Sequence, residues 1–214
     1  MPDAVVSRFF SLFKEENFWY AVFSSLLRTF IAFTISFLTA YLFAFLAAKF
    51  APVGKILDTL VAVLRAAPTV AVILIAYAFM SSRAMSVVVG FLIAFPILYA
   101  NFLTALRSVD KNLITMASIY KVKKSSAVLN VYFLNILPSV FDASKSTLSL
   151  TLKVVIAAEI LTSVSKSVGG AIKNANSTFE IDYLLAWTCM AILLSFLLEI
   201  LVALLKKSCV RWEK

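Results

Sequence analysis

The chain has 214 residues, of which 62% are hydrophobic and only 14% are charged. Soluble proteins carry roughly 25% charged residues, and a soluble domain of this size could not bury so much apolar surface. The composition therefore predicts a polytopic membrane protein. The net charge of +9 collects at the ends of apolar segments, which indicates membrane topology and not a nucleic-acid-binding face. There is no His, and the two cysteines lie in different surroundings, so we expect neither a disulfide nor a metal site.

Residues 1–20 are amphipathic and mixed in charge, and their apolar runs are short. They lack the basic start and the long apolar core of a cleavable signal. The aromatic residues Phe18, Trp19 and Tyr20 at the end of this segment are typical of the level of lipid headgroups. We predict an interfacial helix here that does not cross the bilayer.

Five apolar segments follow, and each is long enough to cross a bilayer as a helix. We place them at about residues 26–48, 57–80, 85–106, 139–161 and 183–205. Pro68 and Pro96 each remove a helical hydrogen bond, so kinks are expected at both. Arg28 and Arg65 lie inside spans, where snorkelling or an internal ion pair is favoured over contact with a solute. The predicted fold class is an all-α polytopic membrane helix bundle of about five transmembrane helices.

Residues 105–138 form the longest stretch without a clean membrane-spanning run, and they separate the third and fourth spans. Apolar residues recur in its first part at steps of three and four, which predicts an amphipathic helix: Leu106, Val109, Leu113, Met116, Ala117 and Tyr120. Asp110 is a good N-cap for a helix that begins near Lys111. Five basic residues and one acidic residue lie between positions 105 and 125, which favours the cytoplasmic side. From the pattern alone, this stretch is either a basic loop on lipid headgroups or a docking element for a soluble partner.

The fourth span is the most polar of the five. Its polar residues lie at steps of three and four and therefore share one helical face: Asp142, Lys145, Ser146, Ser149 and Lys153. Glu159 lies further along the helix and off this face. Because a charged group in lipid is costly, the face must look at protein or water, as the lining of a polar path or as a seam between subunits. Asp142 and Lys145 can pair at i,i+3, whereas Lys153 has no carboxylate at helical spacing.

The distribution of Lys and Arg predicts the topology. With residues 105–138 in the cytoplasm, eleven basic residues lie inside and five lie outside. The loop between Lys49 and Lys55 is then also inside, and the N-terminus and the loop over residues 162–182 are outside. We predict three parts: the interfacial segment 1–20, a transmembrane domain 21–207 that contains the loop 105–138, and a cytoplasmic basic tail 208–214.

Five short motifs occur along the chain in a distinctive order: residues 25–28 (SLLR), 64–68 (LRAAP), 105–113 (ALRSVDKNL), 158–159 (AE) and 167–170 (SVGG). Their order and spacing resemble the membrane permease subunit of bacterial binding-protein-dependent ABC importers. The likeness covers most of the chain, and it is greatest to the branch for nitrate, sulfonate and taurine-like solutes. The third motif is similar to the segment that precedes the cytoplasmic "EAA" loop of this family.

The resemblance implies a permease of the cell inner membrane that couples to a separate cytosolic ABC ATPase subunit. It also implies a second permease copy, with which the path is formed, and an extracytoplasmic solute-binding protein. The loop after the third span would hold the coupling helix, with these residues at the ATPase: Asp110, Leu113, Thr115, Met116, Ala117, Tyr120 and Lys121. The candidate translocation path is then the fourth span, with Asp142, Lys145, Ser149, Lys153 and Glu159.

The chain departs from the family pattern in the coupling loop. The EAA triplet falls on residues 115–117 (TMA), so only the final Ala is kept, and docking should depend more on shape and apolar contact. The loop Gly falls on Lys121. A left-handed turn costs a non-Gly residue roughly 1–2 kcal/mol, so we expect the loop to bend differently. The family's usual additional N-terminal span is also missing from the predicted count of five.

No Gly-rich phosphate loop occurs in the sequence, so ATP hydrolysis is expected on another subunit, and no catalytic residue or cofactor is expected in this chain. Two alternatives remain. A secondary transporter would need ion-coupling residues and usually internal repeats, and five spans do not divide into equal halves. A membrane-embedded hydrolase could use Ser149 and Lys153, which are i,i+4 neighbours. Lys145 and Lys153 favour a small anionic solute, whereas the carboxylates on the same span leave neutral and cationic solutes open.

Overall fold

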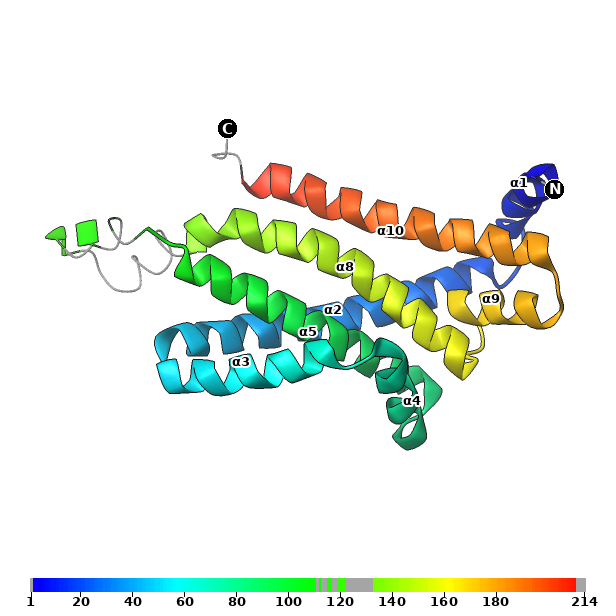
Figure 1. Ribbon diagram of the computed structural model, residues 1–214. Coiled ribbons are helices and arrows are strands. Elements are labelled where there is room, and N and C mark those ends of the chain that lie inside the picture. Colours follow the sequence, from blue (N-terminus) through cyan, green and yellow to red (C-terminus); the bar gives the residue numbers. More distant parts are fainter. Residues whose placement is uncertain (1, 111, 113–114, 117–118, 122–132, 211–214) are drawn as a thin grey trace.

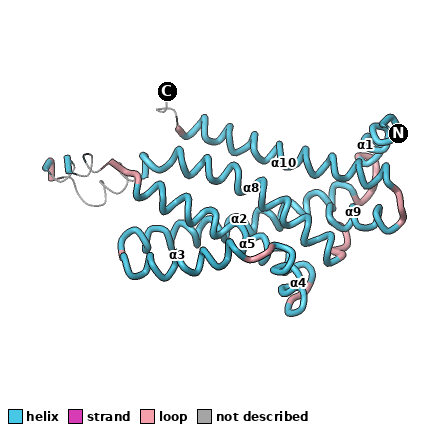
Figure 2. The backbone as a smooth tube through the Cα atoms, in the orientation of Figure 1, coloured by secondary structure: helices cyan, strands magenta, loops and turns pink. Residues whose placement is uncertain are grey.

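The described part of the chain is helical throughout its regular elements (Figures 1 and 2). The computed structural model describes residues 2–110, 112, 115–116, 119–121 and 133–210. Within these residues there are eight helices and no strand: α1 (Pro2–Leu12), α2 (Phe18–Lys49), α3 (Ala51–Ala66), α4 (Thr69–Phe79), α5 (Ser82–Arg107), α8 (Leu134–Thr162), α9 (Val168–Ser177) and α10 (Ile181–Cys209). The predicted all-α fold class is confirmed.

The short helix α1 ends earlier than the predicted interfacial segment. It ends at Leu12, and the aromatic residues 18–20 form the first turn of α2 instead. In the connecting turn, Glu15 Oε2 accepts a hydrogen bond from the Tyr183 hydroxyl of α10 at 2.6 Å. This contact ties the beginning of the chain to α10. A position of α1 at the membrane surface stays a prediction.

Among the residues that the structure describes, three helices are long and apolar enough to cross a membrane: Phe18–Lys49, Ala84–Arg107 and Ile181–Cys209. α3 and α4 together pass the same test as a fourth unit, but they are bent by 96°. α8 has 29 residues, as α10 does, but four charged residues make it too polar for this set. The described part of the chain therefore has three or four apolar spans and one long polar helix, where we predicted about five spans.

The second predicted span is interrupted at Pro68. We expected one span over about residues 57–80 with a kink at Pro68. The chain does bend there, but as a break of 96° between two helices and not as a kink within one. α3 ends at Ala66, Ala67 has an extended backbone with ψ of 128°, and Pro68 precedes the first turn of α4. A proline ring clashes with a helical conformation of the residue before it and offers no N–H to the helix, so the helix ends there. Pro96, by contrast, lies inside a single helix, α5.

α5 packs against both α2 and α8, and these are the most extensive helix contacts in the described chain. α2 presents buried small residues at steps of three and four: Ser25, Thr29, Ala32, Ser36, Ala40, Ala44 and Ala47. At Gly90 of α5, an added Cβ would lie 2.9 Å from Ala32 Cβ and 3.1 Å from Val155 Cγ2 of α8. Small residues let membrane helices approach closely. Many large apolar side chains of α2 point outward instead, as the 62% exposure of Leu38 illustrates.

Segments that we predicted on opposite sides of the membrane lie at opposite ends of the bundle (Figure 1). The α2–α3 connection, the end of α5, the start of α8 and the end of α10 lie at one end. α1, α9 and the start of α10 lie at the other end. We call the first the basic end, because Lys49, Arg107, Lys206 and Lys207 lie there. That the basic end faces the cytoplasm stays a prediction.

Candidate functional site

The segment after α5 carries exposed apolar side chains at the basic end. Asp110 Oδ1 accepts a hydrogen bond from the backbone N–H of Asn112 at 2.8 Å, as expected of an N-cap. Met116 is helical, and its carbonyl accepts the N–H of Tyr120 at 3.0 Å. Met116 and Tyr120 are 52% and 75% exposed, and Ile119 is 69% exposed. Exposed apolar groups beside one another are typical of a contact surface for a partner.

Not all of the predicted coupling residues can be placed. Leu113 and Ala117 lie outside the described residues. Thr115 is helical and exposed. Of the three residues at the EAA positions, the structure thus describes Thr115, which replaces the family's Glu, and Met116, which follows it.

Lys121 takes the backbone conformation that the family's Gly would favour. Its φ is 51°, in the left-handed region. Our expectation that the loop bends differently here is therefore wrong for this residue. The turn keeps its left-handed geometry, and the lysine accepts a cost of roughly 1–2 kcal/mol relative to Gly.

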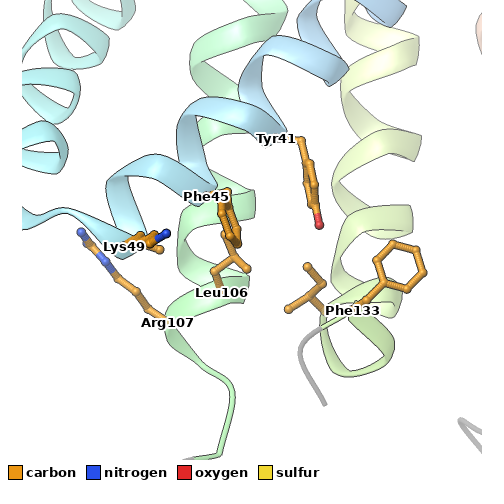
Figure 3. Close-up of a pocket in the computed structure, with 8 residues that line it drawn as sticks. Tyr41, Phe45, Lys49, Leu106, Arg107 and Phe133 are labelled. Atoms are coloured by element: carbon orange, nitrogen blue, oxygen red, sulfur yellow. The ribbon is translucent and has the colours of Figure 1, made fainter. Parts of the chain in front are cut away.

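A pocket of about 400 Å³ lies at the base of this segment, between the ends of α2 and α5 and the start of α8. Figure 3 shows Phe45 and Leu106 next to each other, and Tyr41 and Phe133 across the pocket from them. Sequence reasoning missed this pocket, because its walls come from three segments that no spacing rule connects. The pocket therefore lies beside the end of α2, at the point where the predicted coupling loop begins.

A polar contact fixes α3 to α5 at the same end. The Tyr99 hydroxyl donates a hydrogen bond to Asp58 Oδ1 at 2.9 Å. Arg107 Nη2 lies 4.0 Å from Asp58 Oδ2, at the limit of an ion pair. Asp58 was not among the predicted site residues, since a lone carboxylate in an apolar segment gives no sign of its partner 41 positions away.

The predicted polar face of α8 is divided in the structure. Asp142 does not form the i,i+3 pair with Lys145 that the spacing allows. It accepts hydrogen bonds from Lys206 Nζ of α10 at 2.9 and 3.0 Å instead. Lys145 and Lys153 are exposed, whereas Ser149 is only 2% exposed. The Ser149 hydroxyl has no hydrogen-bond partner among the described atoms, so it is not paired with Lys153. The Ser–Lys pair required by the hydrolase alternative is therefore not assembled.

Glu159 is completely buried, in contact with two other helices. Arg28 Nη1 of α2 donates to Glu159 Oε1 at 2.5 Å, so of the two arrangements expected for this arginine, snorkelling and an internal ion pair, the structure has the ion pair. The Ser25 hydroxyl lies 2.8 and 3.0 Å from the two carboxylate oxygens, and the backbone N–H of Gly169 donates to Oε2 at 3.1 Å. Within one copy of the chain, Glu159 thus joins α2, α8 and α9 and offers no surface to a solute.

The SVGG motif forms the start of α9 beside this carboxylate. The Ser167 hydroxyl caps the helix by accepting the N–H of Gly170 at 2.9 Å. An added Cβ at Gly169 would lie 2.4 Å from Glu159 Cβ and 2.6 Å from the Ile156 carbonyl oxygen, so only Gly fits. Free N–H groups at a helix N-terminus favour a negative charge, which explains why the motif and the buried Glu occur together.

A family model described as "binding-protein-dependent transport system inner membrane component" matches residues 36–210. The chain belongs to this family. Among solved structures, the fold is similar to that of a chain in the crystal structure of an amino acid ABC transporter with histidines, with a TM-score of 0.73. That match covers 95% of this chain and 94% of the other at 14% identity, so it supports the fold and not the solute. A sequence search of curated proteins gives no match.

Family and fold together make this chain a multi-pass inner-membrane permease subunit of an ABC importer. A binding-protein-dependent system needs partners that deliver the solute and hydrolyse ATP, and this permease supplies the membrane component. The motifs that indicated the family have different structural tasks. The AE and SVGG motifs meet at the buried Glu159 network, and residues 105–110 of the third motif cover the end of α5 and the turn after it at the basic end.

Proposed function

We propose that this permease forms the translocation path for a small anionic solute together with a second copy of itself. In this proposal, an extracytoplasmic binding protein delivers the solute at the end that carries α1 and α9. A cytosolic ATPase docks at the basic end, against the segment from Asp110 to Lys121. The N-terminus is then external, and the C-terminus is cytoplasmic.

The observation that carries the choice of solute is the pairing of charges on α8. Both of its carboxylates are neutralised by cations of other helices, Asp142 by Lys206 and Glu159 by Arg28. Among the described residues, no ion pair involves Lys145 or Lys153. In the sequence, these two carboxylates left a cationic solute possible. In the structure both are paired with cations of other helices, so the unpaired charge on this helix is positive.

Lys153 is the residue that we assign to the path. It lies in the middle of α8 on an exposed face, together with Ser146. A lysine at this depth must look at water or at another subunit, because its charge is costly in lipid. A water-filled path between two copies satisfies this condition, and an ammonium group there attracts an anion. Asp142 and Lys145 lie beside α10 instead, and Ser149 and Glu159 are buried.

Uptake into proteoliposomes that contain the permease with its ATPase and binding protein tests the proposal. The panel holds nitrate, taurine and a short alkanesulfonate, with an uncharged amide and a neutral amino acid as comparisons. We expect uptake of an anion, a loss of about tenfold or more in Lys153→Gln, and a larger loss in Lys153→Glu, because the charge at the path is reversed. The control is Lys166→Gln, which changes an exposed lysine just before α9, at the end of the bundle opposite the basic end.

Two results would contradict the proposal. Transport restricted to neutral or cationic solutes would remove the anion from it. Anion uptake that is equally fast in Lys153→Glu and Lys166→Gln would remove Lys153 from the path.

A further inference from the structure

A groove between α8 and α10 at the basic end has the chemistry of a phosphate site, and the proposed transport path does not use it. The groove has a volume of about 260 Å³. It is lined by four charged and four apolar residues: Asp142, Lys145, Lys206, Lys207, Phe141, Val202, Ala203 and Val210. Three lysines therefore face one carboxylate.

The one carboxylate of the groove is already engaged. Asp142 accepts two hydrogen bonds from Lys206 Nζ at 2.9 and 3.0 Å, which holds that lysine in place between the two helices. Lys145 and Lys207 are exposed and form no ion pair within the described part of the chain. The groove thus has two uncompensated positive charges beside a fixed third one, and it should bind an anion.

The surroundings of the groove indicate what kind of anion binds. Val202 and Val210 are buried at its floor. One and two turns before Ala203 of the groove, toward the start of α10, Ile200 and Phe196 are 55% and 58% exposed on the apolar face of a candidate span. A ligand with its negative charge at the lysines would therefore continue along an apolar surface in the direction of the membrane interior. This combination fits a phospholipid better than a free ion.

We propose that this groove binds the headgroup phosphate of an anionic phospholipid such as phosphatidylglycerol. Lys145 and Lys207 contact the phosphate, and the acyl chains lie along Phe196 and Ile200 of α10. Basic pockets between membrane helices at the cytoplasmic surface favour anionic lipids, and each Lys near such a surface contributes about 1 kcal/mol, or about fivefold in affinity. The site would hold α8 and α10 together at the bundle end where the predicted coupling loop begins.

Native mass spectrometry of the full chain, purified in a nonionic detergent with the subunits that accompany it, tests this site. Phosphatidylglycerol and phosphatidylethanolamine with identical acyl chains are titrated separately. We expect the anionic lipid to bind at least tenfold more tightly. Each of Lys145→Gln and Lys207→Gln should weaken it about fivefold, and the double variant about 25-fold. Lys55→Gln removes an exposed lysine from α3 at the same end and should have no effect.

Three results would overturn the assignment. Equal binding of the two lipids would show that the headgroup charge is not read. Displacement of phosphatidylglycerol by millimolar inorganic phosphate would assign the groove to a free anion. Unchanged lipid binding in the double variant, accompanied by loss of the ATPase subunit from the purified complex, would assign the lysines to that protein partner.

Discussion

At the scale of single residues, Glu159 has the largest structural consequence. Its carboxylate is fully buried and is compensated by Arg28, whose side chain is 11% exposed. Ser25 and the N–H of Gly169 complete its hydrogen bonds. Removing one partner of such a pair leaves an uncompensated buried charge, which is far more costly than the loss of an ion pair on a surface.

Replacing Glu159 should therefore destabilise the permease strongly. We expect Glu159→Gln to lower the free energy of unfolding by about 3 kcal/mol or more, because Arg28 stays charged without a carboxylate. The measurement is an SDS unfolding titration of the purified protein, followed by tryptophan fluorescence. A control is the exposed pair Arg8–Glu180, whose side chains are 46% and 51% exposed. Glu180→Gln should cost at most about 1 kcal/mol. Equal losses in the two variants would contradict the role of the buried pair.

At the scale of elements, the packing of α2 on α5 depends on residues with very small side chains where the two helices meet. Gly90 faces Ala32 so closely that a single added carbon would need a shift of a helix, since its distance to Ala32 Cβ would be 2.9 Å. The other neighbours of that carbon are Val155 and Thr151 of α8, at 3.1 and 3.4 Å. Gly90 therefore lets α2, α5 and α8 approach closely at this point.

Gly90→Ala should destabilise the permease, although the same substitution stabilises an ordinary helix. Replacing Gly by Ala within a helix usually stabilises it by roughly 0.5–1 kcal/mol. Here we expect a loss of about 1–3 kcal/mol from overpacking, measured by the same SDS titration. The exchange of both residues, Ala32→Gly with Gly90→Ala, returns the missing space and should be less destabilised than the sum of the two single variants. A stabilised Gly90→Ala variant would show that the helices are not in tight contact there.

At the scale of the whole molecule, the sequence predicted the helical bundle and the grouping of its basic ends, because hydropathy and Lys and Arg positions are local properties. For Arg28 it favoured snorkelling or an internal ion pair over contact with a solute, because a charge inside a span is costly in lipid, and the structure has the ion pair. The sequence did not find the partners themselves. Asp142 meets Lys206 across 64 residues, and Glu159 meets Ser25 across 134. Such pairs are set by how the helices assemble, and no periodicity within one segment contains that information.

The same difference explains what was missed within single helices. Pro68 was expected to kink a span, but whether a proline kinks or ends a helix depends on whether neighbouring helices support the turn before it. In α5, which packs between α2 and α8, Pro96 lies in a continuous helix. Around Pro68 most side chains are exposed, and the helix breaks. Tertiary packing decided between two outcomes that are equivalent in the sequence.

The position of the predicted coupling segment makes a prediction about the assembled importer. In a variant with Cys189 and Cys209 replaced by Ser, single cysteines at Met116, Ile119 and Tyr120 should crosslink to the ATPase subunit. These side chains are exposed on the segment that leaves α5 at the basic end. We expect the yield to change on addition of ATP, because closure of the ATPase would move the segment. The measurement is the crosslinked product on gels of membranes that contain both subunits.

A cysteine at Ile56 is the matched control for these positions. Ile56 is 70% exposed on α3, near the same end, but it is not on the predicted coupling segment. It should give no ATP-dependent product. Met116→Asp should also lower ATPase activity stimulated by the binding protein, because a charge is placed where the partner would bury an apolar side chain. If Ile56 and Tyr120 crosslinked equally and Met116→Asp had normal activity, the segment would be a basic loop on lipid headgroups, and coupling would have to pass through another part of this end.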